Sequence, residues 1–263
     1  MNVIRSRENP RVKAWARLAA EPRERRKRRV AVIEGIHLVE TFLQQGGTPV
    51  SLIVGETAMA RKEVCRLVDQ AGVEAAVLSD KVFSLIADTE TPAGIAAEIR
   101  IPQATIDPGS STGCVFLDGL QNAGNLGTIL RTAAAFGIQD VLVGRGCADP
   151  WSPKALRAGM GGHFFLRVAV CQNLAEEVAR FGGITVCTAA HGGVPLESID
   201  LRGNVGWVFG REAAGVSEAV AQAASLKATI ETPGGAESLN VAASAAICLY
   251  ERLRQLNTHG ARS

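Results

Sequence analysis

Apolar and polar positions in the first part of the chain follow two different periods. Runs of roughly four to eight apolar residues bounded by turn residues predict buried strands, whereas apolar residues roughly three to four positions apart predict amphipathic helices. Strands are predicted at 30–35, 49–56, 73–79 and 93–99, and helices at 12–20, 36–47, 60–72 and 80–88. Their alternation predicts a compact α/β unit.

The same alternation resumes after a segment rich in proline, glycine and serine. Strands are predicted at 114–120, 140–144, 164–170, 184–189, 205–210 and 226–231, and helices at 126–137, 152–162, 174–183, 216–224 and 239–257. Buried strands that alternate with helices are typical of a parallel sheet with helices on both faces. The intervening segment "IPQATIDPGSSTG" has a linker composition. We therefore expect a small α/β domain at 1–104, a linker at 105–112 and a larger α/β domain at 113–263.

The composition is that of an ordinary globular protein, with 47% hydrophobic and 21% charged residues. The N-terminal segment "MNVIRSRENP" lacks the apolar region of a signal peptide, and no apolar run reaches the roughly 18 residues that cross a membrane. We expect a cytoplasmic protein outside the membrane. The six cysteines show no C-x-x-C pair and no histidine at ligand spacing. This pattern favours reduced, mostly buried thiols over a metal site or a disulfide framework.

Basic residues are concentrated in one short segment, although the net charge of the chain is only +2. In "EPRERRKRR", at 21–29, six of nine residues are Arg or Lys. Such a run is compatible with the solvated surface of a helix or loop. It is also compatible with a patch that contacts the phosphates of a nucleic acid, because Arg and Lys displace counterions there.

Three turns of the larger domain are rich in glycine and small polar residues. They are "GLQNAGNLGTILR", "WVFGREAAGVSEAV" and "IETPGGAESLNVAASAA", and each follows a predicted strand. Ligands of parallel sheets bind beyond the carboxyl ends of the strands. One such turn alone is compatible with an ordinary helix cap, for which Asn125 is a candidate, but three in one sheet favour a binding site. The absence of G-x-G-x-x-G after a strand, and of a P-loop motif, disfavours a nicotinamide enzyme or a P-loop NTPase.

In order and spacing, these three segments resemble the motifs of the SpoU (TrmH-like) family of RNA ribose 2′-O-methyltransferases, within the SPOUT superfamily. The resemblance covers about 113–257 and includes "SPKALRAGMGGHFFLRV" between the first two motifs. The segments "SRENPRVKAWARL" and "RVAVIEGIHLVETFL" resemble the small substrate-binding domain, related to ribosomal protein L30e, that often precedes the family's catalytic domain.

This resemblance implies a parallel α/β domain with a C-terminal trefoil knot, a homodimer and a site for S-adenosylmethionine. The positions that match the family's cofactor loops are Thr188, Ala189, Gly210, Ile230, Ser238 and Leu239. Those that match its polar catalytic positions are Asn125, Arg131, Glu212, Ser238 and Asn240. The chain departs from the family's third motif at Glu231 and Thr232, where Pro and Met are usual.

The family resemblance points to Arg131 as the central catalytic side chain, sometimes considered the base. Keeping a guanidinium neutral at pH 7 costs roughly 7 to 9 kcal/mol, because its pKa in water lies far above 7. We therefore expect a charged Arg131 that reaches from the other subunit, binds the phosphate beside the target ribose and stabilises the developing alkoxide. His163 has no partner at a suggestive spacing, and we expect it to be structural.

Together these features predict an S-adenosylmethionine-dependent RNA ribose 2′-O-methyltransferase that acts as a homodimer and needs no metal. We expect ribosomal RNA as the substrate, with transfer RNA as the alternative. The predicted RNA-binding residues are Arg23, Arg25, Arg26, Lys27, Arg28 and Arg29. Two other classes stay open at this point: an RNA-binding protein of the same fold without catalysis, and a nucleotide-dependent Rossmann enzyme.

Overall fold

The computed structural model describes residues 2–212, 214–234 and 237–260. Its helices are α1 (Pro10–Ala20), α2 (Pro22–Arg28), α3 (Ile36–Gln44), α4 (Lys62–Ala71), α5 (Asp80–Phe83), α6 (Ala123–Ala135), α7 (Pro153–Gly159), α8 (Leu174–Ala179), α9 (Glu218–Ala223) and α10 (Val241–Gly260). Its strands are β1 (Val30–Glu34), β2 (Ser51–Gly55), β3 (Ala75–Leu78), β4 (Ile95–Arg100), β5 (Gly113–Leu117), β6 (Asp140–Val143), β7 (Arg167–Val170), β8 (Ile184–Thr188), β9 (Val194–Pro195), β10 (Val205–Phe209) and β11 (Leu226–Thr229). The chain divides into two compact units, Met1–Pro102 with Asp149–Phe164, and Gln103–Ala148 with Phe165–Ser263.

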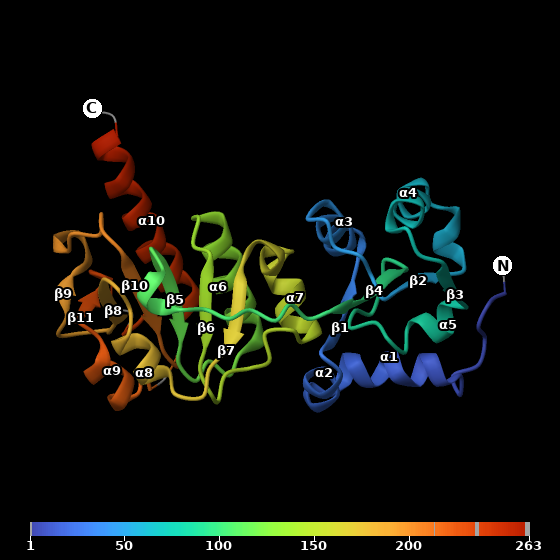
Figure 1. Cartoon of the computed structure of the whole chain (residues 1–263), viewed down its shortest axis with the longest axis horizontal. Helices are drawn as coiled ribbons and strands as arrows, with labels where there is room; N and C mark the ends of the chain where they lie inside the picture. Colours follow the sequence, from blue (N-terminus) through green and yellow to red (C-terminus); the bar gives the residue numbers. More distant parts are fainter. Residues whose placement is uncertain (1, 213, 235–236, 261–263) are drawn as a thin grey trace. The chain divides into compact units, whose positions relative to one another are not determined.

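The first unit is built on a four-stranded mixed sheet in the order β1-β4-β2-β3. The β2–β3 pair is parallel, and β4 runs antiparallel to both β1 and β2. Successive residues of β1 point to opposite faces, so Ala31 and Ile33 join an apolar cluster with α3 and α4, whereas Val30 and Val32 join a second cluster with α1. Figure 1 shows α1 on one side of this sheet and α3 on the other.

The second unit contains a seven-stranded sheet in the order β7-β6-β5-β10-β8-β11-β9, and every neighbouring pair is parallel. On one face Phe116 and Val208 belong to a buried cluster that also includes residues of α8 and α9. Helices α6 and α10 pack against each other and supply further buried residues such as Leu130 and Leu249. The predicted parallel sheet covered by helices is therefore confirmed, and its carboxyl ends all meet at one edge (Figure 1).

The two units do not follow the predicted domain ranges everywhere. Residues 149–164 lie in the range expected for the larger domain, 113–263, but they belong to the first unit. Trp151 and Leu156 explain this, because both are buried in the apolar cluster that α3 and α4 form with the four-stranded sheet. The trefoil knot and the relation to ribosomal protein L30e stay predictions.

Candidate active site

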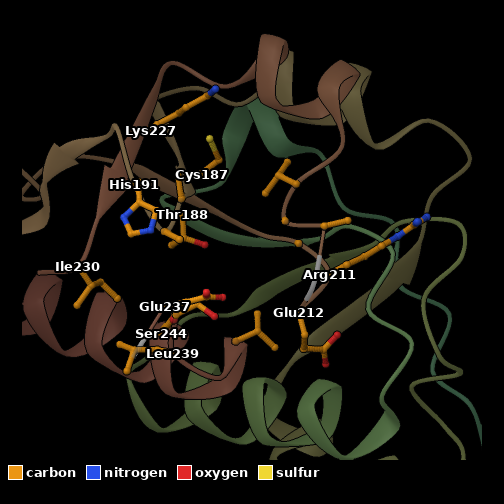
Figure 2. Close-up of a pocket in the computed structure, with 18 of the residues that line it drawn as sticks. Cys187, Thr188, His191, Arg211, Glu212, Lys227, Ile230, Glu237, Leu239 and Ser244 are labelled. Atoms are coloured by element: carbon orange, nitrogen blue, oxygen red, sulfur yellow. The ribbon is translucent and has the colours of Figure 1, made fainter. Parts of the chain in front are cut away.

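A cavity of about 610 Å³ lies at the carboxyl ends of β8, β10 and β11, within the second unit. All six residues predicted to bind a cofactor line it: Thr188, Ala189, Gly210, Ile230, Ser238 and Leu239. They come from three loops that are far apart in the sequence. Figure 2 shows Ile230 and Leu239 on one side of the cavity and Glu212 on the other.

Gly210 sits where β10 ends and the chain turns back on itself. Arg211 and Gly215 exchange two backbone hydrogen bonds of 2.9 Å, which close a tight loop directly after Gly210. A Cβ at position 210 would lie 2.3 Å from the carbonyl of Gly215 and from the amide nitrogen of Val216. Only glycine fits this close approach of two backbone segments, and the loop in turn forms part of the cavity wall.

Three of the predicted catalytic residues are joined in one hydrogen-bonded chain. The side-chain amide of Asn125 donates to the Glu212 carboxylate at 2.6 Å, and the amide of Asn240 donates to the Asn125 side-chain oxygen at 3.3 Å. The Asn240 oxygen accepts from the backbone amide of Ala242, at the start of α10, at 2.9 Å. Ser238 lines the cavity beside this chain. Four of the five predicted positions are thus brought together.

The sequence-based assignment of Asn125 as the cap of the following helix is wrong. Asn122 is the N-cap of α6, and its side-chain oxygen accepts from the backbone amides of Gly124 and Asn125. The helix therefore begins earlier than expected. This leaves the Asn125 side chain, in the first turn of α6, available for Glu212 and Asn240.

Arg131, the fifth predicted catalytic residue, does not line the cavity within one chain. It lies on α6, six residues beyond Asn125, which corresponds to about 9 Å along the helix and roughly 240° around it. Its side chain is exposed, and none of the described residues pairs with it. The exposed positions Thr128 and Ala135 lie on the same stripe of α6.

Several lining residues were not predicted from the sequence. They are Cys187, His191, Arg211, Lys227, Glu237 and Ser244, among others. Lys227 belongs to the body of β11, and His191 lies in the loop that follows β8, so neither falls within a glycine-rich turn. Burial raises the pKa of the Cys187 thiol, which therefore contributes a neutral group to the wall.

The lining suits a ligand with apolar and charged parts. Its volume lies within the range of about 300 to 1,000 Å³ that small-molecule sites occupy. Ile230, Leu239 and Val216 offer an apolar surface for a flat ring, and the carboxylates of Glu212 and Glu237 favour a cation. This chemistry fits S-adenosylmethionine, which joins a purine nucleoside to a sulfonium and an amino acid.

Residues 113–250 match the model of the SpoU rRNA methylase family. The chain belongs to this family. A relative from Bacillus subtilis, 23S rRNA (guanosine(2553)-2′-O)-methyltransferase RlmP, is 34% identical over 253 residues, which cover 95% of this chain and 98% of the relative. The predicted family is confirmed.

Solved structures of RNA methyltransferases resemble nearly the whole chain. The crystal structure of an RNA 2′-O ribose methyltransferase is 32% identical, has a TM-score of 0.80 and covers 97% of this chain and 99% of its own. An rRNA methyltransferase from Sinorhizobium meliloti, solved with bound AdoMet, is 28% identical, has a TM-score of 0.83 and covers 97% of this chain and 98% of its own. The fold class expected from the motifs is thereby confirmed.

The N-terminal unit of this SpoU family member carries the predicted RNA-binding residues, and residues 9–97 match an MRM3-like substrate binding domain. The prediction that Arg25 contacts RNA is wrong. Its side chain is only 2% exposed, pairs with Asp149 at 2.7 Å and donates to the carbonyls of Leu18 and Ala19. Arg25 therefore stabilises the unit, because its charge is fully occupied by internal partners.

The remaining cations of the segment 21–29 differ in whether an internal carboxylate already pairs with them. Arg28 pairs with the buried carboxylate of Glu98 at 3.0 Å, and Trp15 donates to the same carboxylate at 2.8 Å. Four others are exposed, and no described residue forms an ion pair with them: Arg23, Arg26, Lys27 and Arg29. They are the cations of α2 and its C-terminal cap that a polyanion can reach.

Other sequence expectations concern buried groups and absences. His163 is buried in the first unit, as expected of a structural residue, and its Nε2 lies 2.8 Å from the carbonyl of Pro150. All six cysteines are free, and four of them are buried. Within 2–212, 214–234 and 237–260, no helix is long and apolar enough to cross a membrane. The same ranges hold no group of three or more His, Cys, Asp or Glu residues placed to bind a metal ion.

Proposed function

We propose that this protein methylates a ribose 2′-hydroxyl of ribosomal RNA with S-adenosylmethionine as the methyl donor. One observation carries the proposal: the loop after β8 and the second and third motif segments converge on a single cavity. Asn125 of the first motif joins them at its edge through hydrogen bonds with Glu212 and Asn240. The B. subtilis relative that matches over nearly its whole length acts, by its name, on 23S rRNA. We extend that substrate class to this chain.

S-adenosylmethionine, when bound, supplies a methyl group on a positively charged sulfur, and this sulfur is the leaving group when a ribose oxygen takes the methyl group. The chain's own residues hold and orient the reactants. The apolar wall at Ile230 and Leu239 holds the purine, and the close-packed turn at Gly210 positions the backbone beside it. Glu212 and Glu237 provide negative charge for the cationic part of the ligand.

A homodimer completes this site in our proposal. Arg131 points to a different side of α6 from Asn125, so it acts at the cavity of a second copy rather than at its own. Helix α10, which packs on α6, exposes apolar side chains next to this surface: Ile247 is 38% and Tyr250 is 56% exposed. An apolar face of this kind favours association of two copies through α6 and α10. The charged guanidinium then binds the phosphate next to the target ribose.

The substrate RNA is held by the exposed cations of α2 and its cap. Arg23, Arg26, Lys27 and Arg29 contact phosphates, which positions the RNA without reading its bases. Arg28 contributes less, because Glu98 already neutralises it. A cytoplasmic location agrees with this substrate and stays a prediction.

Methylation of total RNA from cells that lack the gene tests the proposal directly. The purified protein with labelled S-adenosylmethionine should modify 23S rRNA from such cells and leave rRNA from normal cells unlabelled. Mapping of 2′-O-methyl positions in both RNAs then identifies the nucleotide, for which guanosine is the first candidate. Labelling of transfer RNA alone, or of no RNA, would contradict the proposed substrate.

Replacing Arg131 by lysine tests the role given to the guanidinium. Lysine keeps the charge but lacks the planar fork that binds a phosphate through two parallel hydrogen bonds. Arg131→Lys should retain RNA affinity and lose most of its turnover. Mixing Arg131→Ala with a second variant whose cavity is defective, such as Gly210→Ala, should restore part of the activity, because each mixed dimer contains one complete site. Unchanged turnover of Arg131→Lys, or no complementation, would count against this arrangement.

A further inference from the structure

The hydrogen-bonded chain of Glu212, Asn125 and Asn240 has a fixed direction. At one end the backbone amide of Ala242 can only donate, and it donates to the Asn240 side-chain oxygen at 2.9 Å. At the other end the Glu212 carboxylate accepts from the Asn125 amide at 2.6 Å. Between them Asn240 donates to Asn125 at 3.3 Å. The Ala242 amide can only donate and the Glu212 carboxylate accepts. These two groups therefore fix which end of each asparagine side chain is the oxygen and which is the nitrogen.

This direction decides which polar atoms remain for a ligand. Each side-chain amide has two N–H groups, and in both Asn125 and Asn240 one of them is used within the chain. Among the described residues, none accepts the second N–H of either amide. Each side-chain oxygen already accepts one hydrogen bond, in Asn125 from Asn240 and in Asn240 from the Ala242 amide. The two asparagines thus present hydrogen-bond donors, and the site they form suits an acceptor atom or a negatively charged oxygen.

The donors lie at the edge of the cavity. Glu212 lines it, and Asn240 stands between Leu239 and Val241, which both line it. Asn125 lies on α6 beside them, 2.6 Å from the Glu212 carboxylate.

We propose that Asn125 and Asn240 form a two-donor site for the ribose 2′-oxygen, and that Glu212 and the Ala242 amide act as positioning groups that keep both donors pointed at it. This inference rests on the proposed methyl transfer. It assigns these residues to stabilising the oxygen as negative charge develops, rather than to removing its proton. Preorganised donors of this kind need no reorientation during the reaction.

The step balances as follows. The O–H bond of the ribose breaks and its proton leaves to solvent water, while the oxygen electron pair forms the new O–CH₃ bond. The S–CH₃ bond breaks, its electrons stay on sulfur, and the product is neutral S-adenosylhomocysteine. The two N–H donors stabilise the oxygen between proton loss and bond formation, when its negative charge is greatest.

Replacing Asn240 by aspartate removes one donor and keeps the shape of the side chain. Asn240→Asp can still accept from the Ala242 amide, but it cannot donate to Asn125 or to the ribose oxygen. We expect kcat on rRNA to fall roughly 100-fold or more, the usual cost of losing such a donor. The affinity for S-adenosylhomocysteine, measured by calorimetry, should change little.

Asn122→Asp is the matched control. It introduces the same negative charge at the start of α6, two hydrogen bonds away from Asn240, and the aspartate still caps α6 by accepting from the amides of Gly124 and Asn125. Its kcat should stay close to that of the wild type. If Asn240→Asp keeps full turnover, or if Asn122→Asp loses as much, the two-donor site is overturned while the proposed function stands. A wild-type protein that binds S-adenosylhomocysteine and methylates no rRNA would overturn both.

Glu212→Gln separates positioning from proton removal. A glutamine oxygen still accepts from the Asn125 amide, but the negative charge that faces the cationic part of the ligand is lost. A positioning role therefore predicts a higher KM for S-adenosylmethionine and a pH–rate profile of unchanged shape. A general base at this position would instead lose nearly all activity on the same change, together with the acidic limb of the profile. The second outcome would overturn the positioning role of Glu212.

Discussion

In the first unit Arg25, Glu98 and His163 are buried and bound to internal partners, whereas the second unit exposes polar side chains around its cavity. Arg25, Glu98 and His163 are each at most 5% exposed, and each has a hydrogen-bond partner inside the first unit. Glu212 and Asn240, by contrast, are exposed at the ends of strands and loops. A charged residue in a helical run can therefore serve stability alone, while an exposed polar cluster at the carboxyl edge of a parallel sheet is available to a ligand.

The sharpest way to test this contrast is to remove Arg25. Arg25→Met leaves the nearly buried Asp149 carboxylate without its cation, and breaking a buried pair in this way costs about 3 to 5 kcal/mol. The free energy of unfolding should fall by that amount in denaturant titrations. Arg26→Ala, next in the sequence but exposed, should change it by no more than about 0.5 kcal/mol. Equal losses in the two variants would refute the division of roles within the basic segment.

Acid should destabilise the first unit through His163. Burial lowers the pKa of this imidazole from 6.5 to about 4. The folded state stays neutral between these values while the unfolded state takes up a proton, so the free energy of unfolding falls as the pH drops from 6.5 towards 4. The full shift corresponds to roughly 3 kcal/mol. His163→Asn should show a shallower decline over the same pH range, and parallel curves would contradict this explanation.

In the second unit the corresponding test is Gly210→Ala. The added methyl group collides with the backbone of Gly215, and overpacking of this kind costs about 1 to 3 kcal/mol. Because the displaced loop forms the cavity wall, the affinity for S-adenosylhomocysteine should fall roughly tenfold to hundredfold. Gly203→Ala, just before the other end of β10, meets no atom within 4 Å and serves as the control. Calorimetry that finds equal affinities for both variants would show that the turn does not shape the site.

The smallest effect is expected from the exposed cations of α2. Replacing Arg26 and Lys27 by alanine should weaken rRNA binding without changing the affinity for S-adenosylhomocysteine. The slope of log K against log salt should decrease by roughly 0.7 to 0.9 for each phosphate contact that is lost. Arg180→Ala, whose side chain already pairs with Asp107 and Glu177, should leave the slope unchanged. A double variant with the wild-type slope would place the RNA elsewhere on the protein.

Local pattern was sufficient to predict most of the fold. The strand expected at 205–210 is β10 at Val205–Phe209, because a continuous apolar run between glycines has few other stable conformations. The two-residue strand β9 is too short to produce any pattern. Helix α6 starts earlier than expected because Asn122, and not a later residue, caps it.

The turns at the strand ends allowed part of the site to be predicted from the sequence. Residues whose position depends on tertiary packing could not be predicted in this way. The glycine-rich turns contain Gly210 and Ser238, and the family resemblance added Thr188. All three line one cavity. Lys227 was missed because a lysine within a strand carries no local signal of its own. The burial of Arg25 was also beyond reach, since its partner Asp149 is 124 residues away and the run "RERRKRR" looks uniform in sequence.

Residues 149–164 have a consequence for how this protein could be divided. The polypeptide passes between the two units at three points, after Pro102, after Ala148 and after Phe164. Cutting the chain only after Pro102 would separate Trp151 and Leu156 from the apolar cluster that buries them. The remaining fragment would then expose an apolar surface that favours aggregation. The N-terminal unit therefore cannot be exchanged for that of another protein by a single recombination event, because it is built from two separate stretches of the sequence. Any swap must also rewrite the stretch of the methyltransferase half that folds with it.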